Sequence, residues 1–180
     1  MQEQKKYPIN PQASRQLNQY ERVLVSTDDK EIAQIARSFG AEVPFLGNSV
    51  ADDLAPSSEA TLAALKQEEL HWGVNFDVVS QLMSNCPLRD ATDITASVQN
   101  FIDQKIDTQL SCFRFGWMNP WWAARLSGSG VPDYLFPEAK ISRSQDLPPL
   151  YCPSGALWIA RVPGLTKSEI FLLQNTSFIH

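Results

Sequence analysis

Short apolar runs alternate with stretches of helical periodicity along most of the chain. The runs that predict strands are residues 22–26 (RVLVS), 41–46 (AEVPFL), 75–83 (NFDVVSQLM), 108–115 (TQLSCFRF) and 155–162 (GALWIARV). Among them, residues 75–83 are the best candidate for a central strand. Strands that alternate with helices require crossover connections, so the pattern predicts an α/β fold with a mainly parallel sheet.

Three helices are predicted between these strands. Their apolar faces are Ile32, Ile35, Ala36 and Phe39 in the first, Leu62, Leu65 and Leu70 in the second, and Ile94, Val98, Phe101 and Ile102 in the third. The residues that can cap their N-termini are Asp28 with Glu31, Ser57 or Ser58, and Asp90 with Asp93. Gly40 supplies a C-terminal stop for the first helix.

Two segments depart from this alternation. Residues 1–20 are rich in Gln, Asn and Lys and are interpreted as a polar lead-in. Residues 116–153 are rich in Pro, Gly, Ser and Trp and show no clear period, so we interpret them as an excursion from the sheet rather than a linker. The length of 180 residues then predicts a single domain.

Composition argues against several classes of protein. A formal net charge of −5 provides no basic stripe to bind nucleic acid. No window approaches the roughly 18 consecutive apolar residues of a membrane span, and the first residues lack the apolar core of a secretory signal. The three cysteines have no metal-ligand spacing and suit a reducing cytoplasm. Because His71 and His180 are the only histidines, chemistry centred on histidine is not expected.

Ligands of open α/β sheets bind beyond the carboxyl ends of the strands, which directs attention to two strand-to-helix turns. In the first turn, Asp28 and Asp29 would repel a phosphate, and simple helix capping is the favoured interpretation. In the second turn, residues 83–90, Arg89 can hold a phosphate or carboxylate with its planar guanidinium, and Asn85 adds an amide. Pairing of Arg89 with a neighbouring aspartate is an equally good interpretation of these residues.

The excursion carries the remaining candidate groups. Trp117, Trp121 and Trp122 form a dense aromatic cluster, which is favoured at cores and subunit interfaces but could also stack on a base or sugar. Arg143 and Gln145 lie in a polar loop, where they either bind a carboxylate and hydroxyls or face solvent.

Four blocks of the sequence carry a family resemblance. RVLVSTDDKEIAQIARSFGAEVPFL is similar to the pattern VIVSTDD…EIA…GAEVPFLRP, and ADDLAPSSEATLAAL resembles a D…SS helix start. SQLMSNCPLRDATDI resembles the loop LLQPTSPLR, and SRSQDLPPLYCPSGALWI resembles R-Q-x-LP…NGAIYI. In this order the blocks resemble the acylneuraminate cytidylyltransferase family, the CMP-sialic acid synthetases and relatives that handle legionaminic and pseudaminic acids. The resemblance extends from about Glu21 to the end and leans toward the legionaminic-type branch.

The resemblance implies a Rossmann-like nucleotide-diphospho-sugar transferase fold. It also implies a reaction in which the anomeric hydroxyl of a nonulosonic acid attacks the α-phosphate of CTP and pyrophosphate leaves, with Mg²⁺ neutralising the triphosphate. The substrate-binding residues that it implies are Ser57 and Ser58 near the nucleotide, Asn85 and Arg89 in the nucleotide-sugar pocket, and Arg143 and Gln145 at the sugar acid. The aromatic excursion then corresponds to a homodimerisation element.

The chain also departs from the family pattern. The phosphate-loop motif ARxGSKxxPxKN and the acidic IDID-type motif do not occur in it, so we expect the metal ligands to lie outside these residues. Gly47, Met83 and Ser154 replace an arginine, a glutamine and an asparagine of the pattern. A truncated paralogue that only binds or assembles with a partner is therefore the alternative hypothesis. An A-type glycosyltransferase ranks third, because its D-x-D metal motif is absent.

Overall fold

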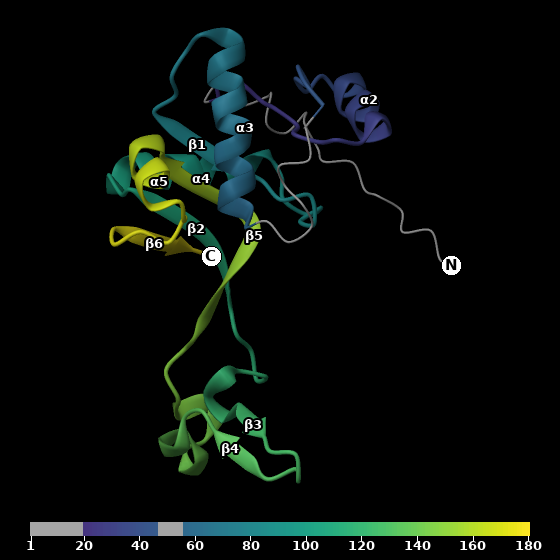
Figure 1. Cartoon of the computed structure of the whole chain (residues 1–180). Coiled ribbons are helices and arrows are strands. Elements are labelled where there is room, and N and C mark those ends of the chain that lie inside the picture. The colour runs from purple at the N-terminus through teal and green to yellow at the C-terminus, as the bar shows by residue number, and fades with distance from the viewer. Residues whose placement is uncertain (1–19, 47–55) are drawn as a thin grey trace.

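A computed structural model describes residues 20–46 and 56–180 and shows a body from which an arm projects (Figure 1). The body contains a four-stranded sheet with the strand order β1-β5-β2-β6. Its strands are β1 (Val78–Gln81), β2 (Thr108–Arg114), β5 (Tyr151–Arg161) and β6 (Thr176–Ile179). The predicted lead-in, except for Tyr20, and residues 47–55 lie outside the described part of the chain.

The α/β class is confirmed, but the sheet is mixed. Strands β1, β2 and β6 point in the same direction, whereas β5 runs antiparallel to both β1 and β2. This orientation follows from the excursion, because the chain leaves the sheet at the end of β2 and returns along β2 as its antiparallel partner. Since β5 occupies the middle, β1 is an edge strand of the described sheet and not the central strand that its apolar sequence predicted.

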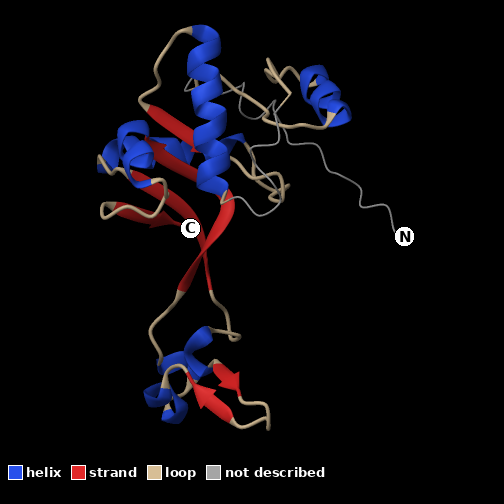
Figure 2. Ribbon diagram, viewed as in Figure 1, coloured by secondary structure: helices blue, strands red, loops and turns tan. Residues whose placement is uncertain are grey.

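Helices cover both faces of this sheet (Figure 2). On one face α4 (Ala91–Gln104) packs through Phe101 against alternate residues of β5, Leu157 and Ile159. On the other face α3 (Ser57–Trp72) and α5 (Val162–Ser168) pack against β2 and β5, with Leu110, Ala160, Leu165 and Phe171 at the centre and Leu62 at the margin. Full burial of one such large apolar side chain contributes about 1.5–3 kcal/mol.

The predicted apolar faces are only partly buried, and in the first helix Ile35 and Phe39 are 43% and 39% exposed. Leu65, Ile94 and Phe101 are buried as predicted. Leu70 is 77% exposed and Ile102 is 54% exposed. Figure 1 shows the C-terminal end of α3 extending past β1, which explains why Leu70 finds no sheet to pack against.

One of the three predicted helix starts is confirmed. Asp90 and Asp93, which were predicted to start the third helix, form a capping box at the start of α4. In α2 (Lys30–Ser38) the cap is Asp29 rather than Asp28, because the Asp29 carboxylate accepts hydrogen bonds from the amides of Glu31 and Ile32. Helix α3 begins directly after Pro56 with no side-chain cap, so the predicted capping role of Ser57 or Ser58 is wrong.

Residues 20–46 form a small unit with a hydrophobic cluster of its own. The cluster consists of Val25, Ala33, Ala36, Ala41 and Val43. The two strands predicted at 22–26 and 41–46 do not form, apart from one parallel bridge between Leu24 and Glu42. The unit meets α3 through Arg22, which forms an ion pair with Glu42 at 3.0 Å and lies over the Trp72 ring. Charge therefore contributes to the junction between the unit and the body.

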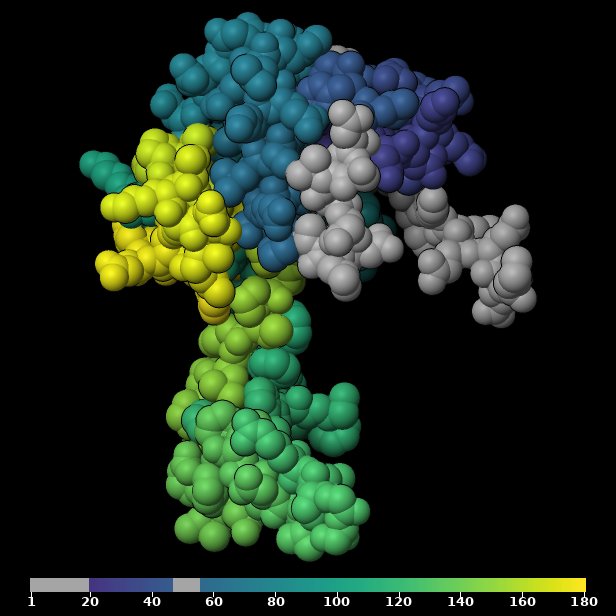
Figure 3. Space-filling model, viewed as in Figure 1, coloured from purple at the N-terminus to yellow at the C-terminus, as the bar shows by residue number. Residues whose placement is uncertain are grey.

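The arm consists of the residues between β2 and β5, so most of the segment interpreted as an excursion, 116–153, lies in it, whereas residues 151–153 belong to β5. The arm contains the hairpin of β3 (Ala124–Leu126) and β4 (Pro132–Tyr134) and three short 3₁₀ helices, η1 (Pro120–Trp122), η2 (Pro137–Ile141) and η3 (Ser144–Asp146). Figure 3 shows it as a separate lobe that is joined to the body by a narrow neck. Within the described residues, no helix is both long and apolar enough to cross a membrane.

Glu68 is a buried carboxylate at the junction between residues 20–46 and α3. It is 5% exposed, and its Oε1 has no hydrogen-bond partner within the described residues. Burial, together with repulsion from Glu42, raises its pKa from the ordinary value of 4.5 to about 7, and the positive charge of Arg22 opposes the rise. The folded protein therefore favours the protonated form of Glu68.

We expect Glu68→Gln to stabilise the protein selectively at high pH. The stabilisation from neutral Glu68 is fully present below about pH 4.5 and is lost as the pH rises through about 7. Urea unfolding should show equal stability of wild type and variant near pH 4.5 and an advantage of about 2 kcal/mol for the variant near pH 8. Glu59→Gln, which changes an exposed carboxylate of the same helix, is the control. A difference between Glu68→Gln and wild type that does not vary with pH would contradict this account.

Candidate functional site

The loop that follows β1, residues 82–90, forms an elbow that rests on β5. The amide of Met83 donates a hydrogen bond to the carbonyl of Gly155 at 3.1 Å, and the amide of Arg89 closes a turn onto the carbonyl of Cys86. The cap of α4 at Asp90 follows directly. The elbow therefore lies beyond the C-terminal end of β1, where ligands of α/β sheets bind.

The segment of β5 that contacts the elbow is a bulge. Leu110 pairs with Trp158 and Cys112 pairs with Pro153, so Ser111 alone stands opposite residues 154–157. A bulge of this kind turns backbone carbonyls out of the ladder and makes them available to neighbours. Here the carbonyls of Gly155 and Ala156 both accept hydrogen bonds from the elbow.

Arg89 fastens the elbow to the bulge. Its Nη1 donates to the carbonyl of Met83 at 3.2 Å and to the carbonyl of Ala156. Nε and Nη2 make no hydrogen bond to the described residues. Burial lowers the pKa of the guanidinium, and the nearby Cys86, Tyr20 and Asp93 oppose that effect. The aspartate pairing left open by the sequence is not formed as an ion pair, because Asp90 and Asp93 serve the capping box.

Tyr20 joins this site from the N-terminal unit. Burial raises the pKa of its phenol, while the Ser80 side chain and the Arg89 charge nearby oppose the rise. The Tyr20 hydroxyl has no hydrogen-bond partner among the described residues. The N-terminal unit thus contributes a polar atom next to the guanidinium of the elbow.

The other predicted site residues lie in different parts of the molecule. Asn85 is exposed on the elbow, where its Oδ1 faces the thiol of Cys86. Ser57 and Ser58 start α3, and Ser58 is buried. Arg143 and Gln145 lie on the arm, which projects away from the elbow (Figure 1). The structure therefore brings Asn85 and Arg89 together but separates them from Arg143 and Gln145.

Arg143 and the arm tryptophans already have contacts within the arm. The Arg143 guanidinium forms two hydrogen bonds to the carboxylate of Asp146, at 2.6 and 3.0 Å. The indole N–H groups of Trp121 and Trp122 donate to the carbonyls of Pro148 and Ala139, so these two residues hold the arm together. Trp117, in contrast, is 80% exposed.

The donor set near the elbow does not fit a magnesium ion held by the protein. Among the described residues, no group of three or more His, Cys, Asp or Glu side chains could hold a metal ion. The Asp90 carboxylate, at the end of the elbow, accepts hydrogen bonds from the amides of Thr92 and Asp93, and the Asp93 carboxylate accepts one from the amide of Asp90. Octahedral magnesium requires oxygen ligands that are free to bind it.

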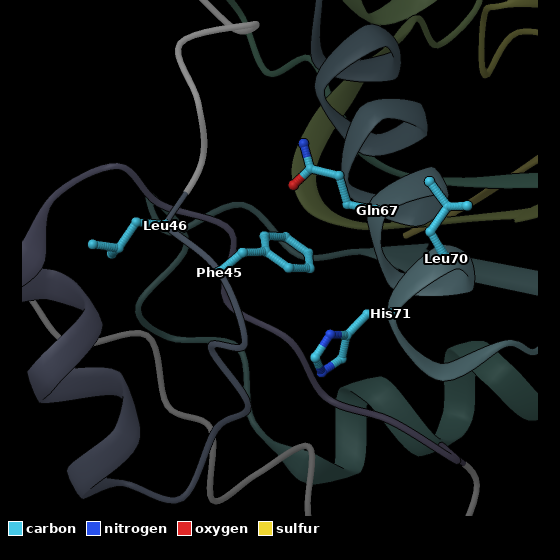
Figure 4. Close-up of a pocket in the computed structure, with 5 residues that line it drawn as sticks. All are labelled: Phe45, Leu46, Gln67, Leu70 and His71. Atoms are coloured by element: carbon cyan, nitrogen blue, oxygen red, sulfur yellow. The ribbon is translucent and has the colours of Figure 1, made fainter.

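A hollow lies at the C-terminal end of α3 (Figure 4). It has a volume of about 410 Å³ and is lined by Phe45, Leu46, Gln67, Leu70 and His71. His71 contacts the Phe45 and Trp72 rings edge-on, with ring centroids 6.4 and 4.9 Å apart. His71 is exposed, and it lies against these two aromatic rings.

Sequence reasoning missed three residues of the elbow contact. They are Tyr20, Ser111 and Gly155. A glycine inside a strand pattern is a known signal of a bulge or a close approach, so Gly155 could have been found. Ser111 carried no comparable signal, because serine is common at half-buried strand positions.

Two solved structures share this fold. One is CMP:2-keto-3-deoxy-manno-octonic acid synthetase complexed with CTP, with a TM-score of 0.60 at 14% identity, covering 93% of this chain and 76% of that chain. The other is 4-diphosphocytidyl-2C-methyl-D-erythritol synthase from Anaerococcus prevotii, with a TM-score of 0.57 at 9% identity, covering 95% and 77%. At these identities the likeness establishes the fold.

Sequence comparison establishes the family. The model of the cytidylyltransferase family matches residues 9–115, which is more than half of the chain, and the chain therefore belongs to this family. The resemblance deduced from the four sequence blocks is confirmed at this level.

Named relatives point in the same direction. Pseudaminic acid cytidylyltransferase of Campylobacter jejuni is 27% identical over 88% of this chain and 68% of the relative. CMP-N,N'-diacetyllegionaminic acid synthase of Legionella pneumophila is 27% identical over 87% and 66%. Post-translational flagellin modification protein B of Campylobacter coli is 30% identical over 51% and 40%. The chain thus spans about 40% to two thirds of the length of these relatives.

We expect Gly155→Ala to disrupt the contact between elbow and bulge. An added Cβ would lie closer than 3.0 Å to Met83 Sδ and 3.1 Å from Met83 Cβ. Thermal or urea unfolding should show a loss of about 1–3 kcal/mol. Adding Met83→Ala should recover part of that loss in a double-mutant cycle. Gly116→Ala, where nothing lies within 4 Å of the added atom, is the matched control. Equal losses at positions 155 and 116 would rule out the contact as the cause.

Proposed function

We propose that this protein takes part in transfer of CMP from CTP to a nonulosonic acid of the sialic, legionaminic or pseudaminic type. The anomeric hydroxyl of the sugar acid attacks the α-phosphate, the bond between the α- and β-phosphates breaks, and pyrophosphate leaves. Membership of the cytidylyltransferase family and the two relatives named for such sugar acids support this assignment. The observation that carries it is the cationic elbow beyond the end of β1, held by Arg89.

In this proposal the elbow lines the nucleotide-sugar pocket. The guanidinium of Arg89 keeps Nη1 on the main chain and offers Nε and Nη2 to an anionic substrate, and Asn85 offers its amide. Ser57 and Ser58 lie near the nucleotide. A hydrogen bond to a charged group contributes about 1.5–3 kcal/mol, which is enough to fix a phosphate or carboxylate.

Magnesium enters this proposal with the triphosphate. No step is assigned to a metal held by the protein, because the described side chains do not provide a ligand set. Mg²⁺ commonly binds substrate phosphates and keeps several of its waters. The reaction is placed in the cytoplasm, where the three free cysteines remain reduced.

The arm is proposed to build a homodimer. Arg143 and Gln145 would then hold the sugar acid close to the dimer contact, and a second chain would bring an arm to an elbow. Exposed apolar side chains on the arm support an interface, above all Trp117, Met118 and Ile141. Trp121 and Trp122 would contribute indirectly, because they hold the arm in shape.

The alternative function is a non-catalytic paralogue that binds nucleotide or assembles with an intact partner. Such a paralogue would keep the sheet and the arm without turning over substrate. Both functions predict binding at the elbow, and turnover distinguishes them.

We expect the protein to bind CTP more tightly with Mg²⁺ than without it in calorimetric titrations. Arg89→Ala should weaken binding about tenfold or more, because a charged contact is lost. Arg37→Ala is the matched control, since Arg37 also donates to a main-chain carbonyl, that of Val43, but far from the elbow along the chain. Thermal unfolding of both variants separates lost binding from lost stability. The proposal fails if wild type binds no CTP, and the role of Arg89 fails if both variants bind like wild type.

We expect Trp117→Ser to shift the protein from dimer to monomer. Trp117 is exposed and makes no contact that holds the arm, so its loss should weaken association without unfolding the arm. Sizing chromatography with light scattering over a range of concentrations measures the change. Leu172→Ser, at an exposed apolar position of the body, is the control. A wild type that stays monomeric, or a variant that dimerises as well as wild type, would refute this interface.

A further inference from the structure

The hydroxyl of Ser111 organises the bulge of β5. Ser111 Oγ accepts hydrogen bonds from the amide of Leu157 and from the hydroxyl of Ser154, both at 2.9 Å, and lies 3.2 Å from the carbonyl of Ser154. The Ser154 carbonyl also accepts the indole N–H of Trp158. One side chain therefore satisfies backbone groups that the interrupted ladder between β2 and β5 leaves unpaired.

The bulge held by Ser111 is the same segment that receives the elbow. Gly155 and Ala156 lie between Ser154 and Leu157, the two residues that donate hydrogen bonds to the Ser111 hydroxyl. Their carbonyls accept the Met83 amide and the Arg89 guanidinium. The direction of these two carbonyls depends on the shape of the segment between Ser154 and Leu157. The position of the elbow depends on the direction of the carbonyls.

We propose that Ser111 is a positioning residue for the elbow site. Its hydroxyl fixes the shape of the bulge, and this shape fixes the direction of the Gly155 and Ala156 carbonyls. The two carbonyls then hold Met83 and Arg89 in the arrangement that binds an anionic ligand. Ser111 touches no substrate in this account and acts through Arg89. The part that concerns ligand binding rests on the proposed function, whereas the part that concerns elbow geometry does not.

The same contacts link the elbow to the neck of the arm. Strand β5 runs from Tyr151, which pairs with Arg114 at the neck, through Ser154 and into the bulge. Along β5, Ser154 and its hydrogen bond to Ser111 therefore lie between the neck and Gly155.

Amide hydrogen exchange measured by NMR tests the geometric part. In Ser111→Ala the Met83 and Leu157 amides should exchange about tenfold faster than in wild type, the size expected for loss of a half-buried hydrogen bond. The Arg89 Nε–H resonance should shift as well. The Ile94 amide, which donates to Asp90 in the first turn of α4, reports general loosening and should change little.

A second variant separates the hydroxyl of Ser111 from that of its neighbour. Ser154→Ala removes one donor but leaves the bond from the Leu157 amide to Ser111, so its effect on the Met83 amide should be smaller. The proposal is overturned if the Met83 amide in Ser111→Ala exchanges as in wild type, or if it accelerates no more than the Ile94 amide.

Calorimetric titration with CTP and Mg²⁺ tests the link to the ligand. Ser111→Ala should weaken binding several-fold, in the same direction as Arg89→Ala, while the combined variant should be no weaker than Arg89→Ala alone. Additive losses would overturn the claim that Ser111 acts through Arg89. If wild type binds no CTP, the proposed function fails, and the exchange measurements still decide whether Ser111 positions the elbow.

Discussion

The pairing of β5 with both β1 and β2 is the constraint on which the rest of the structure depends. The eleven residues of β5 supply a central strand of the sheet, the apolar contacts on both of its faces, the bulge and one side of the neck. Because side chains alternate along a strand, Ile159 faces α4 while Ala160 faces α5. A shift of one residue in the register of β5 would exchange these faces. It would also displace the β5 carbonyls that accept hydrogen bonds from the elbow.

In the proposed site, the Arg89 guanidinium has to hold the loop in place and also to bind an anionic ligand, and both tasks draw on its five N–H groups. Nη1 of Arg89 donates to carbonyls of the loop and the bulge, which orders the elbow but leaves only Nε and Nη2 as donors for a ligand. A lysine could not do both, because its single ammonium has no second, geometrically fixed set of donors. The half-buried position also lowers the pKa of the guanidinium, because burial penalises its charged form.

Local patterns predicted most of the body, but the strands expected at 22–26 and 41–46 do not form, and α5 and β6 were not predicted. Periodicity found α3, α4, β2 and β5 within a few residues, and Asp90 with Asp93 found the start of α4. It could not place β5 between β1 and β2, since strand order is decided by contacts distant in sequence. In the same way Arg89 was recognisable as a cation at a helix start, whereas its attachment to Ala156 depends on a bulge that only the pairing of two strands creates.

The separation of the elbow from the arm limits how the candidate residues can cooperate. Within one chain Arg89 and Arg143 belong to different lobes that are joined by a narrow neck (Figure 3). Arg143 is also paired with Asp146, but this pair is exposed on both sides, and such pairs contribute no more than about 1 kcal/mol. A ligand carboxylate could therefore replace Asp146 at little cost once an arm is brought to an elbow. In the proposed homodimer, the energetic cost of a joint site therefore lies in bringing the two lobes together and not in freeing the guanidinium.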